Sequence, residues 1–187
     1  SDEWVVEAER RGLLNLKSTA DAIATFVQPK NVALFEKYGV FTEAEMRSRS
    51  EIMLDNYRKT VHIEAQTMID MARKQILPAV ESYAAKLAET LATKKALSPL
   101  LGGKYETSLL TKLSGLTDDI AEAADALEAS LVAYHKIGDV TEAACFIRDE
   151  VLPKMDALRA PADEAERFTA AEYWPFPTYG DLLFGVK

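Results

Sequence analysis

An apolar stripe with helical spacing constrains this chain more than any other feature. From Leu54 to Leu91 its steps average about 3.7 residues, close to the period of a straight helix and above the 3.5 of a heptad. The stripe consists of Leu54, Tyr57, Val61, Ala65, Met68, Ala72, Ile76, Val80, Tyr83, Leu87 and Leu91. Thr42 and Glu45 form a capping-box pattern ahead of it. The pattern predicts one helix of about 50 residues, which Pro78 should bend near residues 75–77.

Shorter amphipathic segments flank this helix. Short helices are expected over residues 2–11, 18–27 and 32–38, and longer ones over residues 105–135 and 140–160. Gly12 and Gly39 should close the first and third, whereas Ser18 and Asn31 should cap the second and third. Short turns between long amphipathic helices favour antiparallel neighbours.

The predicted fold is therefore all-α. We expect an elongated antiparallel helical bundle around one very long, Pro-kinked helix, with short N-terminal helices and an irregular aromatic C-terminal tail. The expected division is 1–41 for the short helices, 42–167 for the bundle and 168–187 for the tail, within one structural domain. The stretch 73–81 also resembles 148–156, with Pro78 and Pro153 in matching places. This similarity indicates two matched kinks or is a chance product of helical sequence.

Charge and composition exclude several classes of partner. The formal net charge is −8, and the Lys and Arg residues are interspersed with acids. Nucleic acid and anionic membranes are therefore not expected partners. No apolar run approaches the ~20 residues of a membrane span. The single cysteine, Cys145, suits a reducing compartment, and we expect a cytoplasmic location.

The sequence contains no recognisable catalytic, cofactor or metal site. His62 and His135 lack the Glu-x-x-His spacing of a di-iron bundle, and one cysteine with two distant histidines does not supply a zinc site. Cys145 lies in an apolar run and is interpreted as a small core residue. His62 is interpreted as a partly buried packing residue. His135 falls in a last helical turn, where a cation favours the helix dipole, and phosphotransfer is the alternative role.

The C-terminal segment is too apolar to remain free in water. Its candidate docking residues are Trp174, Phe176, Tyr179, Leu182 and Phe184. Pro175 and Pro177 forbid a regular helix across them. The segment docks either on its own bundle or on another domain or subunit.

Several stretches resemble the C-terminal region of type III glutamine synthetases, the large bacterial and cyanobacterial class. They are residues 7–16, 34–41, 64–72, 76–80 and 174–184, the last reading Trp-Pro-Phe-Pro-Thr-Tyr-Gly-Asp-Leu-Leu-Phe. The resemblance covers essentially the whole chain. It implies a parent enzyme that joins glutamate and ammonia through a γ-glutamyl phosphate, using ATP with Mg²⁺ or Mn²⁺, in stacked hexameric rings.

The family's metal and nucleotide contacts would lie upstream of Ser1, so no catalytic residue is carried over. A chain that starts Ser-Asp-Glu without Met also fits a segment of a longer protein. We therefore expect a structural and assembly domain, whose partners are the catalytic domain of the same chain and neighbouring subunits of a homo-oligomer. The alternative is a free-standing helical adaptor that binds partner helices in a groove. An upstream reading frame encoding a catalytic domain would separate the two hypotheses.

Overall fold

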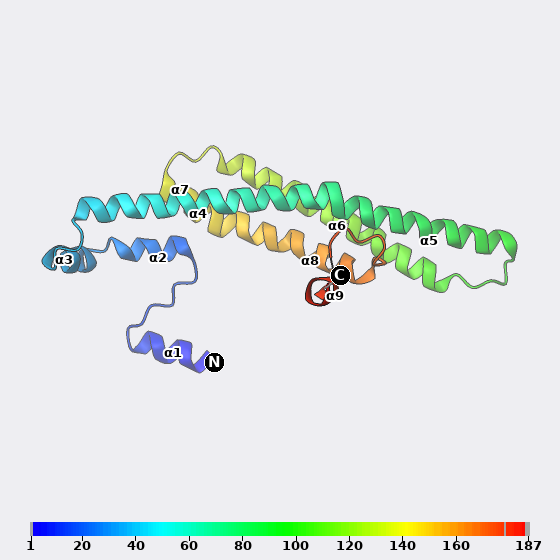
Figure 1. The fold of residues 1–187 in the computed structure, drawn as a ribbon, viewed down its shortest axis with the longest axis horizontal. Coiled ribbons are helices and arrows are strands. Elements are labelled where there is room, and N and C mark those ends of the chain that lie inside the picture. The colour runs from blue at the N-terminus through cyan, green and yellow to red at the C-terminus, as the bar shows by residue number, and fades with distance from the viewer. Residues whose placement is uncertain (1, 178, 186–187) are drawn as a thin grey trace. The chain divides into compact units, whose positions relative to one another are not determined.

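A computed structural model describes residues 2–177 and 179–185, without the side chains of Asp2 and Tyr179. Within these ranges the chain forms helices and no strand, so the all-α prediction is confirmed (Figure 1). The elements are α1 (Asp2–Arg10), α2 (Thr19–Phe26), α3 (Pro29–Lys37), α4 (Glu43–Met71), η1 (Ala72–Ile76), α5 (Leu77–Leu97), α6 (Lys104–Tyr134), α7 (Val140–Phe146), η2 (Ile147–Val151), α8 (Leu152–Phe168) and α9 (Tyr179–Phe184). None of the helices in the described ranges is both long enough and apolar enough to cross a membrane.

The chain divides into two compact units. Unit 1 comprises Ser1–Ile63 and Ala133–Glu150, and unit 2 comprises Glu64–Val132 and Val151–Lys187. The boundaries at residues 41 and 167 that the sequence suggested stay a prediction.

Helix α4 begins at the predicted capping box. The Thr42 N–H donates to the Glu45 carboxylate at 2.8 Å, and the Glu45 N–H donates to the Thr42 hydroxyl at 3.3 Å. These reciprocal bonds satisfy two donors that a helix start leaves without partners. From there α4, η1 and α5 follow one another without a break, as one helix of 55 residues.

A π-helical turn precedes each of the two matched prolines. In η1 the Leu77 N–H donates to the carbonyl of Ala72, five residues earlier, directly before Pro78. In the second copy η2 ends at Val151, two residues before Pro153. Proline supplies no N–H and crowds the carbonyl four residues back, and a wider turn relieves both problems. The repeat therefore encodes the same local structure twice, whereas the bend at Pro78 stays a prediction.

The π turn also lengthens the spacing of the apolar stripe locally. Three successive steps of four residues, from Met68 through Ala72 and Ile76 to Val80, span η1, because the wider turn takes an extra residue to return to the same face. The buried positions of the long helix in unit 2 are Ala65, Ile69, Ala72, Ile76, Val80, Ala84 and Leu87. Met68 and Tyr83, which the sequence placed in the core, are only half-buried, since their neighbours Ile69 and Ala84 point inward instead.

The other two helices of unit 2 complete its core. Leu113, Ile120 and Leu127 of α6 and Leu158 of α8 are almost completely buried. Two ion pairs show that the long helix and α6 run antiparallel. Arg73 contacts Asp125 at 2.6 Å and Lys94 contacts Glu106, so numbers rise along one helix as they fall along the other. Lys112 of α6 contacts Glu164 of α8 at 2.6 Å.

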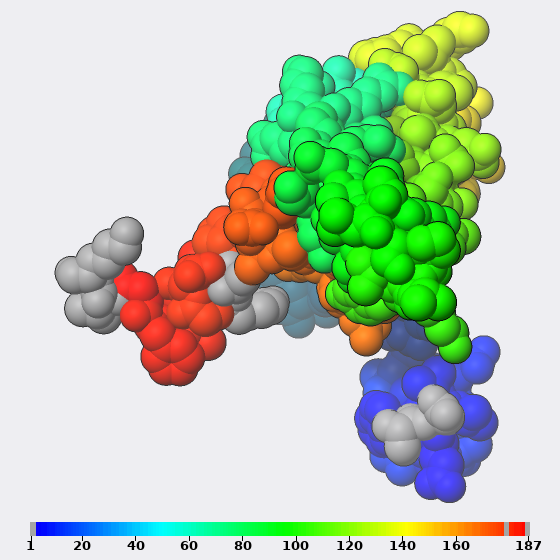
Figure 2. Space-filling model, turned by 90° about the vertical axis from the view of Figure 1, so that its right-hand side faces the viewer, coloured from blue at the N-terminus to red at the C-terminus, as the bar shows by residue number. Residues whose placement is uncertain are grey.

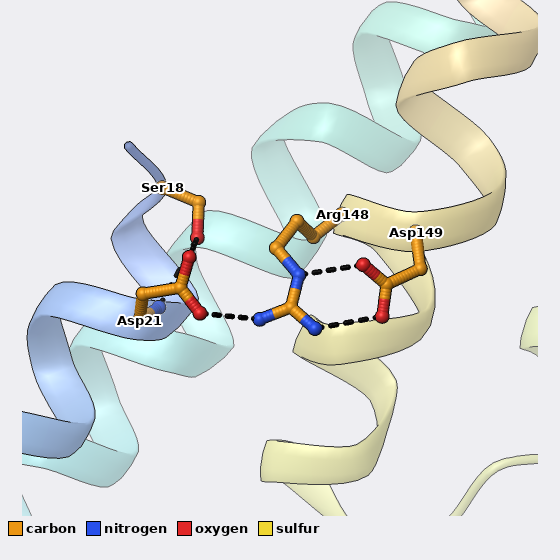
Figure 3. A network of polar contacts seen from close by, with 4 residues as sticks. All are labelled: Ser18, Asp21, Arg148 and Asp149. Carbon is orange, nitrogen blue, oxygen red and sulfur yellow. Dashed lines mark hydrogen bonds and ion pairs between the residues drawn. The ribbon is translucent and has the colours of Figure 1, made fainter. Parts of the chain in front are cut away.

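In unit 1, α2 docks through a small apolar cluster and a polar network. Ala20 and Ile23 of α2 pack with Leu54 of α4 and Ala144 of α7. Beside this cluster Arg148 donates to Asp21 at 2.5 Å and to Asp149 at 2.6 Å (Figure 3). The hydrogen bond to Asp149 raises the pKa of the Arg148 guanidinium, and the charge of Asp21 adds to this effect. In turn, Arg148 lowers the pKa of Asp149.

Ser18 caps α2 as predicted, because its hydroxyl accepts the Asp21 N–H at 3.1 Å. Two other boundaries differ from expectation. Asn31 does not cap α3, which begins at Pro29, and its amide instead donates to the Thr25 carbonyl at the end of α2. Helix α8 does not fade at Pro161 but continues to Phe168. Leu158 and Ala165 both lie in the core, and this burial holds the helix together across the proline.

Candidate docking surface

The end of α8, from which the C-terminal segment continues, is held by side-chain and backbone contacts. The Lys112 ammonium lies 3.9 Å from the centre of the Phe168 ring and pairs with Glu164, one turn earlier. Its cation lowers the pKa of Glu164. Thr169 is buried, and its N–H and hydroxyl both donate to the Ala165 carbonyl, at 2.9 and 2.8 Å. The Lys112 contacts hold the last turn of α8 against α6, and the Thr169 hydrogen bonds close the end of the helix.

A tight turn then brings the aromatic residues back onto unit 2. The N–H groups of Tyr173 and Trp174 both donate to the Ala170 carbonyl, at 2.9 and 3.2 Å. The Tyr173 ring lies 5.3 Å, centre to centre, from the ring of Tyr83 on α5. Burial raises the pKa of the Tyr83 phenol, and the neighbouring Tyr105 raises it further.

Trp174 and Phe176 are half-buried and form an edge-to-face pair, with ring centres 6.1 Å apart. They line one side of a partly open, mainly apolar hollow of about 220 Å³. The other lining residues come from α4, η1 and α8 and are Met68, Met71, Ala72, Ile76, Leu158, Arg159, Ala162, Asp163 and Glu166. Half-buried Met68 therefore belongs to this hollow rather than to the inner core.

Beyond the prolines the environment changes completely. Helix α9 presents Leu182, Leu183 and Phe184, which are 68 %, 70 % and 81 % exposed. Figure 2 shows the red surface of α9 open to the viewer next to the orange end of α8. Three consecutive large apolar residues at this exposure form a patch, not the scattered exposed leucine of an ordinary surface.

The two readings of the segment therefore apply to different parts of it. Trp174 and Phe176 lie against their own bundle. Leu182 and Phe184 do not, and the Tyr179 side chain lies outside the described residues. The tail is irregular only as far as Pro177, because α9 follows. Docking of the segment on another domain or subunit stays a prediction.

Sequence reasoning missed one cluster in unit 1. His62 and His135 were treated as separate, yet their rings meet with centres 4.8 Å apart. The His62 ring also stacks on Tyr134, and the Tyr134 hydroxyl accepts a hydrogen bond from Arg58 at 3.1 Å. No sequence motif connects these positions. Their proximity results from the pairing of α4 with the end of α6.

The histidine cluster and Cys145 give no catalytic geometry. His62 is half-buried as predicted, with its Nδ1 buried and unpaired among the described atoms, whereas His135 is exposed and lies just after α6. Cys145 is half-buried, between the buried Ala144 and Ile147, and so is less enclosed than a core residue. Among the described residues, no group of three or more His, Cys, Asp or Glu side chains fits a metal ion.

The geometry defines a class of protein segment. It is helical, has an exposed apolar terminus, and contains no catalytic cluster in its described part. The model of the family "Glutamine synthetase C-terminal domain" matches residues 1–95. The chain therefore belongs to the glutamine synthetase C-terminal domain family.

Similar proteins extend the match over the whole chain. A glutamine synthetase of Butyrivibrio fibrisolvens is 38 % identical over 190 residues, which cover 100 % of this chain and 27 % of that protein. A type-3 glutamine synthetase of Dictyostelium discoideum is 27 % identical, over 98 % of this chain and 26 % of its own length. A glutamine synthetase of Bacteroides fragilis is 31 % identical with the same coverage. The chain thus spans about a quarter of the length of these relatives.

Proposed function

We propose that this chain is the non-catalytic structural and assembly segment of a type III glutamine synthetase. The whole enzyme would join glutamate and ammonia, and its ATP and Mg²⁺ or Mn²⁺ would be bound by the part that lies outside this chain. Two relatives named glutamine synthetase, one of them type-3, are about four times as long as this chain and support the assignment. They favour it over a free-standing adaptor, which would require no catalytic partner. We propose a cytoplasmic enzyme.

The observation that carries the proposal is the contrast within the C-terminal segment. Trp174 and Phe176 anchor it on unit 2, and Pro175 and Pro177 limit its freedom between the anchor and α9. Leu182, Leu183 and Phe184 are thereby presented on a short helix with most of their surface in solvent. An anchored apolar group loses less conformational entropy on docking than a free one. Segment α9 is therefore suited to clamp this domain onto the catalytic part of its own chain or onto a neighbouring subunit.

The test replaces Leu182, Leu183 and Phe184 by Ser together in the complete enzyme, leaving the anchor intact. The matched control is Leu100→Ser, which removes a 95 % exposed leucine from the turn before α6. We expect the triple variant to sediment as smaller assemblies and to lose activity in proportion, whereas the control keeps both. Normal assembly and activity in the triple variant would contradict the clamp.

A further inference from the structure

A second apolar surface lies at the other end of the chain, in unit 1. None of the residues from Glu3 to Lys17 is buried. Six of them are large apolar residues with 40 % or more of their surface exposed: Trp4, Val5, Val6, Leu13, Leu14 and Leu16. Six such residues within thirteen positions form a patch of the kind that marks an interaction surface.

Local contacts define the shape of this segment, although none of the described residues covers it. The Glu7 carboxylate accepts hydrogen bonds from Arg10 and from Arg11, each at 2.7 Å. Gly12 ends the helix with a φ of 77°, where its N–H bonds to Glu9 and the Leu13 N–H reaches back to the Ala8 carbonyl at 2.9 Å. This Schellman ending turns the chain sharply and fixes the direction in which residues 13–16 leave α1.

An isolated helix of nine residues is marginal in water, and surface ion pairs add little to its stability. Helix α1 therefore needs an apolar partner to be stable. The capping and ion-pair contacts specify its shape, and the exposed residues supply the area for a partner to bury.

The length of the relatives indicates the partner. The family model is named a C-terminal domain, and the matched region is about a quarter of each relative. In such a protein the preceding domain is covalently joined to α1. A tethered neighbour has a high effective concentration and competes well against any free partner.

We infer that the apolar surface of α1 and residues 13–16 docks on the preceding domain of the same polypeptide. This inference rests on the proposed function, since it requires the chain to be part of a longer synthetase. It concerns a different surface from α9, and it assigns to α1 the joint between this segment and the rest of its own chain. The α9 surface remains the candidate clamp.

Hydrogen exchange on the complete enzyme tests the inference. The variant is Val6→Asp with Leu14→Asp, and the control is Val132→Asp, at a 56 % exposed position on α6. We expect the backbone amides of residues 4–16 to exchange slowly in the unaltered enzyme and at least tenfold faster in the double variant, with no change there in the control. Fast exchange of these amides in the unaltered enzyme, or equal rates in all three proteins, would overturn the inference.

Cross-linking from Lys17 distinguishes the partner. Lys17 is exposed directly after the patch. In assemblies made from isotopically light and heavy copies, we expect its links to join residues of the preceding domain within one copy. Links only between Lys17 regions of different copies would show that the patch pairs subunits and would overturn the inference. The α9 triple variant gives an independent readout. If the α9 triple variant loses assembly and the amides of α1 exchange fast, the docking of α1 is refuted and the clamp is not. If that variant assembles normally and the amides of α1 exchange slowly, the clamp is refuted and the docking of α1 is not.

Discussion

The rings of His62 and His135 meet edge to face, 4.8 Å between centres, at the place where α4 lies beside the end of α6. His62 is the more enclosed of the two. Burial lowers its pKa, and the neighbouring His135 lowers it further. The cationic groups closest along the same helix are Arg58, which bonds Tyr134, and Lys59, which pairs with Asp55. The neutral imidazole is therefore the form that suits the folded state.

This depressed pKa predicts a pH-dependent stability. At a pH below about 6.5 the unfolded chain binds a proton at residue 62 more readily than the folded chain does. The stability that His62 contributes is therefore complete above pH 6.5 and is lost as the pH falls toward the lowered pKa of the folded protein. Urea unfolding between pH 7.5 and 5 should show a smaller slope in His62→Gln than in the unaltered chain. Identical slopes would remove His62 as the cause.

Leu127 and Met68 allow a prediction about the hydrophobic core. Leu127 is completely buried, so Leu127→Ala should lower the free energy of unfolding by about 2–5 kcal/mol. Met68 lines the partly open hollow under Trp174, so Met68→Ala should cost less, under about 2 kcal/mol, because solvent reaches the space that it leaves. Chemical denaturation checks both. Equal losses would show that Met68 belongs to the inner core after all.

The π turn before Pro78 gives a prediction of small size. A proline in a regular helix interior costs about 3 kcal/mol relative to alanine. Because η1 already bonds Leu77 to Ala72 and Pro78 lies in the first turn of α5, most of that cost should be absent here. Pro78→Ala should therefore change the free energy of unfolding by less than about 1 kcal/mol. A gain near 3 kcal/mol in urea denaturation would mean that the turn does not accommodate the proline.

The polar network of Figure 3 should act locally. Asp21→Asn removes the ion pair with Arg148 while keeping a side chain of the same shape. Since both groups are partly exposed, the global loss should stay below about 1 kcal/mol. Hydrogen exchange should nevertheless accelerate in α2, relative to α6 in the same sample. Asp156→Asn on α8 is the control, and acceleration limited to α2 in the Asp21 variant alone is the expected result.

The helices were predictable because their signals are local. The capping box at Thr42, the cap at Ser18 and the closing glycines Gly12 and Gly39 each act within a few residues, and the structure confirms them. The average period also indicated one long helix. It did not reveal η1, because a single wide turn inside a long stripe changes the mean spacing only slightly.

The sequence predicted the apolar composition of the candidate docking segment, but not how its residues pack. An apolar tail is visible in the sequence, but which residues lie on the bundle depends on the hollow that α4, η1 and α8 form together. Trp174 and Phe176 could not be separated from Leu182 and Phe184 by periodicity, because the prolines interrupt it. The contact of His62 with His135 is likewise a product of helix pairing and has no sequence signal.

The structure of the complete enzyme, determined by electron cryomicroscopy, tests the central claim most directly. The quantity to measure is the exposed surface of Leu182, Leu183 and Phe184, which are 68–81 % exposed in this chain alone. We expect all three to become buried against the catalytic part of the same chain or a neighbouring subunit, while Trp174 stays on its own bundle. If the three side chains remain as exposed in the assembled enzyme as they are here, α9 is not a clamp.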